Sequence, residues 1–222
     1  AGAKLRDYVG LTDAKERVVA IADPAHSAPL ALGTRDGIVK RLSPGSLPSR
    51  PEGEVIALKP GDQIVGAAPA DDAAELVFVS SAAQLLHFGA SNVRPQGASA
   101  GGMTGMKLGD GARVLFFGAI DPAEAQVVTI SGSTQTIDGT DPGRAKVSTF
   151  AEFPGKGRAT GGVRCHAFLK GEDALHLAWV GTDPLAVGSD GSQRALPEGG
   201  SRRDGSGTPL DAVIGSIGSP AS

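Results

Sequence analysis

The sequence is poor in several residues on which enzymes and membrane proteins commonly depend. Its 222 residues include one cysteine, four histidines, one tryptophan and one tyrosine, and aromatic residues make up 4%. A single cysteine cannot form an internal disulfide, so no oxidising compartment is implied. No apolar run approaches the roughly 18 residues of a membrane span, and no signal peptide is visible. We therefore expect a cytoplasmic protein without a membrane partner.

Uninterrupted helical stretches are also missing. The chain contains 33 glycines and 15 prolines, and few stretches of ten residues lack both. The glycines have no period of three, which excludes collagen. Because 40% of the residues are apolar, the chain is long enough to bury a sizeable core. These features predict a turn-rich, all-β fold.

Two alternating patterns repeat along the chain. The first is a β-hairpin with a small or polar turn, and it occurs at residues 29–42, 75–88, 125–137 and 184–196. Asp36-Gly37 and Asp190-Gly191 are strong hairpin turns. The second is a glycine-rich entry, an acidic turn and an apolar strand, at residues 5–21, 53–67, 102–117, 162–180 and 207–214. Hairpins about 46 to 58 residues apart indicate four-stranded units arranged radially.

The repeats predict one domain over residues 1–222. It begins with a partial repeat at 1–28, continues with repeats at 29–73, 74–123, 124–182 and 183–217, and ends with a tail at 218–222. Because the chain starts inside a repeat and has no initiator Met, we expect it to be a piece of a larger protein. A β-sandwich or two small barrels would show the same strand spacing and remains an alternative.

Three segments, at Thr34–Arg41, Arg94–Leu108 and Phe153–Val163, carry motifs that resemble those of one family, the C-terminal domain of type IIA topoisomerase A subunits. Thr34–Arg41 resembles the family's T-x-x-G-x-[VA]-K-[RK] hairpin. Arg94–Leu108 is similar to its R-P-x-G-R-x-[AT]-x-G-V-x-G-[MI]-[KR]-[LF] segment, and Phe153–Val163 to its [YF]-P-x-[KQ]-[GS]-R-x-[TG]-x-G-V entry. The resemblance covers about residues 17–210. It implies an all-β β-pinwheel, a propeller-like disc of about four to five four-stranded blades, open or closed, that binds or bends duplex DNA around its rim.

The branch of this family depends on one further motif. Gyrase A subunits carry a Q-R-R-G-G-x-G box in the first blade, whereas the corresponding stretch here, residues 48–55, reads P-S-R-P-E-G-E-V. Ser99 also stands where many relatives have Arg. The resemblance therefore implies a topoisomerase IV-like protein from a high-GC bacterium, which directs decatenation and relaxation. The alternatives are a gyrase A domain that wraps DNA for negative supercoiling, and a propeller-like protein-interaction scaffold without DNA affinity.

The charge pattern supports a nucleic-acid role better than the net charge of −3 does. Residues 142–170 contain six basic residues and one acid, whereas acids crowd the turns between repeats. Arg202 and Arg203 form a further basic pair. With few aromatics for base stacking, duplex DNA is favoured over single strands. The predicted DNA contacts are Arg35, Lys40, Arg41, Arg50, Arg94, Lys107, Arg144, Lys146, Lys156, Arg158, Arg164 and Lys170.

Catalytic and metal-binding patterns are absent from the sequence. Cys165 and His166 are neighbours that would point to opposite faces of a strand, so they form no nucleophile–base pair. The four histidines lack metal-ligand spacing, and the glycine-rich stretch at 97–105 lacks the Gly-Lys-Ser/Thr of a P-loop. We expect Cys165 and Trp179 in the core, and His87 on the surface. Tyr8 does not match the family's strand-cleaving tyrosine and is expected in the core or on the surface.

We therefore expect a non-catalytic chain with no cofactor of its own. The resemblance implies partners in a holoenzyme, namely the N-terminal breakage–reunion domain of the same polypeptide and the ATPase B subunit, which use ATP and magnesium. It also implies a nucleoid-associated location. A propeller enzyme acting on sugars or nucleotides would need a cluster of carboxylates or histidines at the hub, and none can be placed from the sequence.

Overall fold

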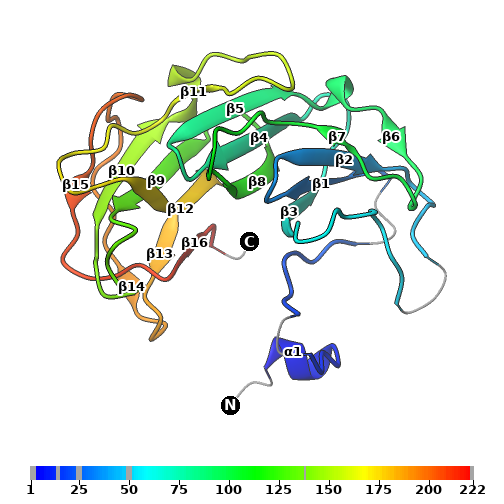
Figure 1. The fold of residues 1–222 in the computed structure, drawn as a ribbon, viewed down its shortest axis with the longest axis horizontal. Helices are drawn as coiled ribbons and strands as arrows, with labels where there is room; N and C mark the ends of the chain where they lie inside the picture. Colours follow the sequence, from blue (N-terminus) through cyan, green and yellow to red (C-terminus); the bar gives the residue numbers. More distant parts are fainter. Residues whose placement is uncertain (1–3, 14–15, 24–26, 49–51, 138, 221–222) are drawn as a thin grey trace.

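The computed structural model describes residues 4–13, 16–23, 27–48, 52–137 and 139–220. Four small β-sheets follow one another along an open arc, as Figure 1 shows. We number them blade 1 to blade 4 in chain order. The predicted all-β, propeller-like architecture is confirmed, and the arc does not close into a ring.

Each blade is built around one antiparallel hairpin. Blade 1 has the order β3 (Ile64–Pro69), β1 (Leu30–Thr34), β2 (Ile38–Leu42) and β6 (Pro95–Gln96), and β7 (Met103–Thr104) also pairs with β2. Blade 2 has β8 (Val114–Ile120), β4 (Glu75–Ser80), β5 (Gln84–Gly89) and β11 (Val163–Arg164). Blade 3 has β12 (Ala174–Gly181), β9 (Gln126–Gly132), β10 (Arg144–Thr149) and β15 (Thr208–Pro209). Blade 4 has β16 (Ser216–Gly218), β13 (Leu185–Val187) and β14 (Gln193–Arg194).

The outermost strand of each of the first three blades comes from farther along the chain. β6 and β7 leave the hairpin of blade 2 to pair with β2, β11 leaves blade 3 to pair with β5, and β15 leaves blade 4 to pair with β10. Each of these three blades is thus hydrogen-bonded to a segment that follows the hairpin of its successor. This exchange covers the outer edge of a sheet, which would otherwise expose unpaired backbone groups.

The inner strands face the concave side of the arc. β3 contacts β8, β8 contacts β12, and β12 contacts β16. β16 lies inside the arc, whereas β11 and β15 lie on its convex side (Figure 1). The inner strands therefore form the hub, and the exchanged strands form the outer edge.

The hairpin turns need a residue with positive φ at one repeated position. Gly37 has φ +84°, Ala83 +54° and Gly143 +69°. The N–H of Gly37 donates to Thr34 O, and the N–H of Ala83 donates to the equivalent Ser80 O, both at 3.1 Å. A Cβ at Gly37 would collide with the carbonyl oxygen of Met106, so glycine is needed there for both conformation and space.

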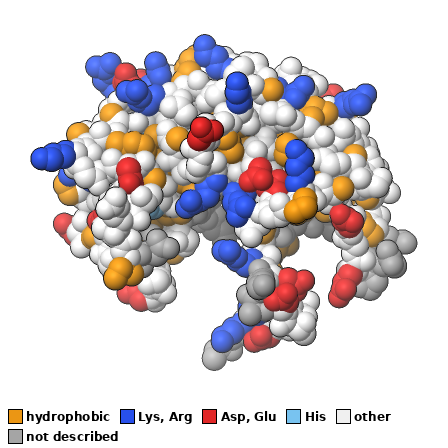
Figure 2. Space-filling view, in the orientation of Figure 1, with side chains coloured by type: hydrophobic (Ala, Val, Ile, Leu, Met, Phe, Trp, Pro, Cys, Tyr) orange, Lys and Arg blue, Asp and Glu red, His pale blue; other side chains and the backbone are white. Residues whose placement is uncertain are grey.

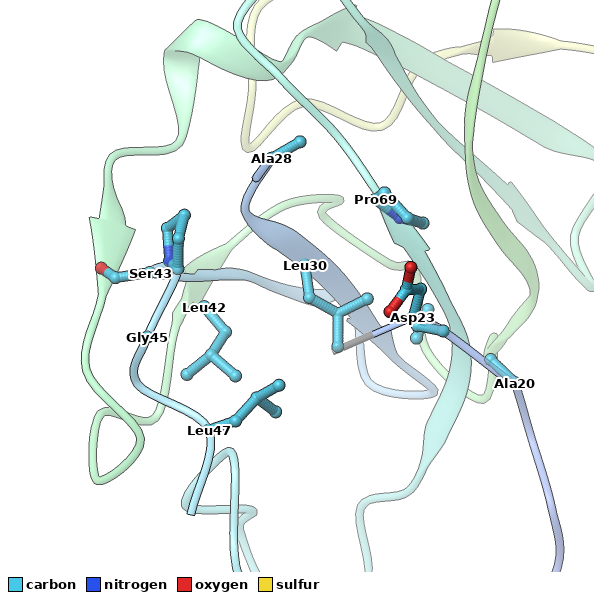
Figure 3. A pocket seen from close by; sticks show the side chains of 12 residues that line it. Ala20, Asp23, Ala28, Leu30, Leu42, Ser43, Gly45, Leu47 and Pro69 are labelled. Atoms are coloured by element: carbon cyan, nitrogen blue, oxygen red, sulfur yellow. The ribbon is translucent and has the colours of Figure 1, made fainter. Parts of the chain in front are cut away.

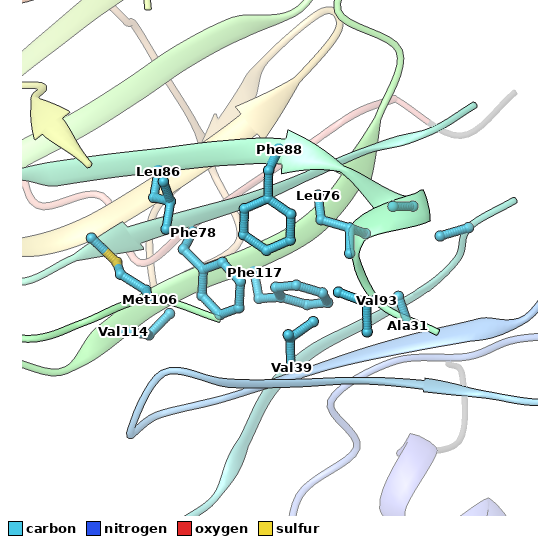
Figure 4. Close-up of a cluster of buried hydrophobic side chains, with 12 residues drawn as sticks. Ala31, Val39, Leu76, Phe78, Leu86, Phe88, Val93, Met106, Val114 and Phe117 are labelled. Atoms are coloured by element: carbon cyan, nitrogen blue, oxygen red, sulfur yellow. The ribbon is translucent and has the colours of Figure 1, made fainter. Parts of the chain in front are cut away.

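The core lies between neighbouring blades. The cluster between blades 1 and 2 includes Val39, Phe78, Phe88, Met106 and Phe117, which Figure 4 shows in close-up. The Phe78 and Phe117 rings are 4.8 Å apart in a tilted arrangement. Two further clusters fill the spaces between blades 2 and 3 and between blades 3 and 4. The apolar faces of the blades therefore hold the arc together.

Close packing between blades 1 and 2 also depends on glycine. A Cβ at Gly33 of β1 would collide with the Phe117 ring, and one at Gly66 of β3 would collide with the Phe117 carbonyl. The missing side chains thus create the room that a phenylalanine from the next blade fills. Part of the glycine excess is explained by this approach and not by turns.

Four expectations from the sequence need correction or completion. No strand forms at Arg17–Ile21, and the described residues before β1 contain only the one-turn helix α1 (Leu5–Tyr8). Trp179 is half-buried and not in the core, because Ala178 and Val180 take the core-facing positions of β12. His87, expected on the surface, is only 11% exposed. Tyr8 lies on the surface, with 83% exposure.

Truncation of a core ring should weaken the whole arc. We expect Phe78→Ala to lower the free energy of unfolding by about 3–5 kcal/mol, because it leaves a cavity among the rings between blades 1 and 2. Urea denaturation followed by tryptophan fluorescence measures the change. Ile137→Ala, at an exposed position, should change it by less than about 0.5 kcal/mol. Equal losses in the two variants would contradict the assignment of the core.

Candidate nucleic-acid interface

Three stretches of chain cross the outer edges of blades 1, 2 and 3. We call residues 93–108, 153–168 and 199–210 the outer segments, since they carry the exchanged strands β6 and β7, β11, and β15 respectively. Together they hold seven Lys and Arg residues and a single acid, Asp204, in a chain whose net charge is −3. Figure 2 shows Lys and Arg side chains spaced along the convex edge of the arc. The outer edge is therefore electropositive on an acidic protein.

Adjacent outer segments are joined into a continuous strip. The N–H of Lys107 donates to Thr160 O, and the N–H of Ala167 donates to Gly205 O, both at 2.9 Å. Side chains add to these links, because Arg158 Nη1 donates to Thr104 O at 2.5 Å and Arg203 Nη1 donates to Arg164 O at 3.4 Å. The basic residues are thus carried by a connected surface that runs from blade to blade.

Five of the twelve predicted contacts lie on the outer segments. They are Arg94, Lys107, Lys156, Arg158 and Arg164. Arg158 is half-buried and the other four are exposed. Lys170 is also exposed, but it lies in the turn that leads from an outer segment to the inner strand β12. Four exposed cations predicted as contacts, Arg94, Lys107, Lys156 and Arg164, are therefore carried by the outer segments.

Two predicted lysine contacts are wrong, because the structure places both side chains in the interior. Lys40 is 0% exposed, and its Nζ donates to Val55 O, Ala98 O and Ala100 O at 2.7–2.8 Å. Lys146 is 1% exposed, and its Nζ donates to Arg202 O and Arg203 O at 2.9 and 2.5 Å. Burial lowers the pKa of both ammonium groups, that of Lys146 to about 8. Neither can reach a phosphate in this conformation.

Arg41 is likewise a structural residue and not a surface contact. It is 2% exposed, and its guanidinium donates to Ala70 O, Ala90 O and Val93 O and pairs with Asp72 at 2.7 Å. It therefore holds the 3-10 helix η1 (Ala90–Asn92), after which the first outer segment begins.

His87 takes the equivalent place in blade 2. Its Nε2 lies 2.9 Å from Phe153 O, directly after the 3-10 helix η2 (Phe150–Glu152), and its Nδ1 lies 2.9 Å from Glu75. These two contacts of the imidazole ring explain why His87 is largely buried. Neither Arg41 nor His87 is placed to contact DNA.

The remaining predicted residues lie off the outer edge or outside the described part of the chain. Arg35, in the first hairpin turn, donates to Gly61 O and is 3.6 Å from Asp36. Arg144 Nε donates to Gly207 O at 3.0 Å and is 3.6 Å from Glu172. Arg50 lies outside the described residues.

Arg202 and Arg203, a basic pair in the sequence, are not among the twelve predicted contacts. Both lie on the third outer segment, and the Arg202 side chain is 85% exposed. Their position five or six residues before β15 matches that of Arg158 before β11. Aligning the short exchanged strands would have identified them.

The potentially reactive side chains of Cys165 and His166 are both buried. Cys165 is fully buried, as expected, and burial raises the pKa of its thiol to about 12. His166 is also buried, with its Nδ1 2.9 Å from Thr129 Oγ1. Burial, with the cations of Lys146 and Arg144 nearby, lowers the pKa of His166 to about 4. A protonated thiol beside a neutral, enclosed imidazole is unreactive.

Other site types are not found in the part of the chain that the structure describes. No group of three His, Cys, Asp or Glu side chains there could hold a metal ion. A cavity of about 330 Å³ lies against blade 1, and Figure 3 shows its largely apolar lining, with Leu30, Leu42 and Leu47 among the residues. Among the described helices, none is long and apolar enough to cross a membrane.

The exchanged outer strands and the electropositive convex edge define a class, the β-pinwheel domain. The family model of the DNA gyrase C-terminal domain, a β-propeller, matches residues 29–71, 74–121 and 139–173, more than half of the chain. The chain therefore belongs to the DNA gyrase C-terminal domain family, the C-terminal domains of type IIA topoisomerase A subunits.

Similar proteins agree with this family. The DNA gyrase A protein of Pseudomonas aeruginosa is 34% identical over 146 residues, which are 64% of this chain and 14% of that protein. The DNA gyrase A protein of Mycolicibacterium smegmatis is 30% identical over 138 residues, which are 60% of this chain and 15% of that protein. The matched region thus spans about a seventh of these relatives.

Solved structures show the same fold at lower sequence identity. The C-terminal domain of DNA topoisomerase IV aligns with a TM-score of 0.74 and 21% identity, over 89% of this chain and 63% of that one. A DNA gyrase A C-terminal domain aligns with a TM-score of 0.69 and 17% identity, over 88% and 66%. The fold is therefore common to both branches of the family.

The buried histidine makes stability depend on acid. Because the pKa of His166 is about 4 when folded and about 6.5 when unfolded, only the unfolded chain takes up this proton between these values. We expect the free energy of unfolding to fall by up to about 3 kcal/mol as pH drops from 6.5 to 4. Urea denaturation across this range measures the slope.

A matched pair of variants isolates this effect. His166→Asn should flatten the slope, whereas His176→Asn, at an exposed position of β12, should leave it as in the wild type. A wild-type slope in His166→Asn would show that other groups cause the acid sensitivity.

Proposed function

We propose that the outer edge of the arc binds duplex DNA without sequence preference and bends it, as the C-terminal domain of a type IIA topoisomerase A subunit. The observation that carries this proposal is the charge of the outer segments: seven Lys and Arg against one Asp, on a chain of net charge −3. Membership of the DNA gyrase C-terminal domain family supports it.

The chemistry of the outer segments fits the DNA backbone better than its bases. Lys and Arg that neutralise phosphates release condensed counterions, a gain that is independent of sequence. Bases are read by side chains that enter a groove, whereas the outer segments lie along the edge as short strands and glycine-rich loops. Since the basic residues follow a convex arc, a duplex that contacts several blades must bend toward it.

The remaining members of the assembly follow from the family. We expect the chain to act beside the breakage–reunion domain of the same polypeptide and the ATPase B subunit, on DNA in the nucleoid. ATP and magnesium would be used by those parts, and this chain would need no cofactor of its own. The burial of Cys165 and His166, which favours their uncharged forms, supports a non-catalytic role.

Within the family, we propose a topoisomerase IV-like role that directs decatenation and relaxation. The support is the sequence at residues 48–55, which lacks the Q-R-R-G-G-x-G box of gyrase A. Residues 49–51 of this stretch lie outside the described part of the chain. Wrapping of DNA for negative supercoiling, as by a gyrase A domain, is the competing role.

Removal of positive charge from the outer edge should weaken DNA binding. We expect the chain to retard a duplex at about 50 mM salt, with affinity falling steeply as salt rises. Lys156→Glu with Arg164→Glu should weaken binding at least about tenfold and make the salt dependence shallower. Fluorescence anisotropy with a labelled duplex at several salt concentrations measures both.

A control with the same kind of charge change tests the location. Arg113 is exposed in the turn before the inner strand β8 and lines a cavity with His176, Ser189 and Val213, away from the outer segments. Two-fold or smaller effects are expected for Arg113→Glu. If wild-type protein retards no duplex, the DNA proposal fails, and the scaffold role, with partner binding that survives high salt, takes its place.

The branch can be tested on closed circular DNA. A nicked plasmid is ligated in the presence of the chain, and the linking number is read by gel electrophoresis. We expect little or no shift, because no gyrase box is present. A strong positive wrap would contradict the topoisomerase IV-like role and support the gyrase role. The proposal that the chain binds DNA would stand in either case.

A further inference from the structure

A buried ammonium group holds the backbone of the two arginines on the third outer segment. Lys146 Nζ donates to the carbonyl oxygens of Arg202 and Arg203, at 2.9 and 2.5 Å. The lysine side chain is 1% exposed, whereas the Arg202 side chain is 85% exposed. One interior cation thus fixes the main chain of two consecutive cations, of which Arg202 is exposed and Arg203 is half-buried.

The same position in the other blades shows that the fold does not require a lysine there. Lys146 follows the positive-φ residue Gly143 by three positions, as Lys40 follows Gly37 in blade 1 and Leu86 follows Ala83 in blade 2. Leu86 is fully buried in a well-packed core. A blade can therefore be built with an apolar residue at this position.

Charge is costly at this position of blade 3. The pKa of Lys146 is lowered to about 8, mainly by burial and to a smaller extent by the neighbouring cation of Arg203. Cys165, Asp204 and Glu152 oppose this shift. The cations of Lys146 and Arg144 also both lower the pKa of His166. Keeping the Lys146 ammonium charged costs free energy, and blade 2 has a leucine at the same position. We therefore expect the lysine to provide an advantage other than packing.

We propose that Lys146 is a positioning residue for DNA binding, which holds the Arg202–Arg203 backbone so that both guanidinium groups face the convex edge. The inference rests on the proposed function of that edge. Lys146 touches no DNA itself, and it acts by reducing the conformational freedom of the two arginines before binding.

Blade 1 provides the contrast that makes the role specific. Lys40 Nζ donates to three carbonyls, including Ala98 O and Ala100 O of the first outer segment. The residues that it holds there carry no charge. The two lysines are thus equally buried anchors, but only Lys146 anchors cations.

The experiment uses the whole chain and a labelled duplex at several salt concentrations. Lys146→Met should weaken binding about three- to tenfold and reduce the slope of log K against log salt by about 1–2, as expected when one or two phosphate contacts are lost. Arg202→Ala with Arg203→Ala should have the same effect. Adding Lys146→Met to that pair should change nothing further.

Matched variants separate positioning from general damage. Lys40→Met removes an equivalent buried ammonium and should leave the affinity and the salt slope as in the wild type. Lys146→Arg keeps a donor and should restore at least half of the lost slope. Lys146→Leu, with the residue that blade 2 uses, serves where the Met variant does not fold, as judged by circular dichroism.

The outcomes are distinct for the two proposals. Absence of DNA binding by the wild-type chain would overturn the proposed function. Normal binding by the wild type, with an unchanged salt slope in folded Lys146→Met or Lys146→Leu, would overturn the positioning role alone. Equal losses in Lys40→Met and Lys146→Met would also overturn it, because the effect would then reflect stability.

Discussion

The exchange of outer strands between neighbouring blades is the constraint on which the rest of the structure depends. A three-stranded blade leaves an open edge, and each of the first three blades closes it with a strand from its successor. To reach that edge, the chain must leave its own hairpin, cross to the previous blade and return to the hub. The outer segments exist because of this path, so the surface that carries the basic residues is a consequence of sheet closure.

The buried cations follow from the same path. A crossing segment of two-residue strands and glycine-rich loops leaves many carbonyl groups without partners in a regular ladder, and a buried carbonyl needs a donor. Lys40 and Lys146 each satisfy two such carbonyls from inside the blade, and Arg41 satisfies Val93 O in addition to two carbonyls outside the outer segments. Long side chains with several N–H groups are suited to this task, because one residue can bond several oxygens that no strand reaches.

These residues also show how far the sequence could be interpreted. The hairpins at Asp36-Gly37 and Asp190-Gly191, the turn-rich all-β class and the propeller-like arrangement could all be predicted, because they depend on local turn chemistry and on repetition. The burial of Lys40 and Lys146 could not. Alternation along a strand tells which side chains share a face, but here the face is covered by residues about 60 positions farther along the chain. In the same way, the apolar sequence around Trp179 predicted a buried strand. It could not show which face of that strand, β12, packs against blade 2.

The separation of charge between interior and edge connects fold and function. If every Lys and Arg of the hairpins had faced outward, the convex edge would carry more charge but its loops would lack their anchors. Instead, Lys40, Arg41 and Lys146 of the hairpins face inward to backbone oxygens, whereas the crossing loops carry the exposed cations Arg94, Lys107, Lys156, Arg164 and Arg202. Because the outer segments are bonded to one another through Lys107–Thr160 and Ala167–Gly205, the exposed cations belong to one connected strip. In the proposed function, a duplex that met this strip at one blade would be directed to the next, and the curvature of the arc would set the curvature of the bound DNA.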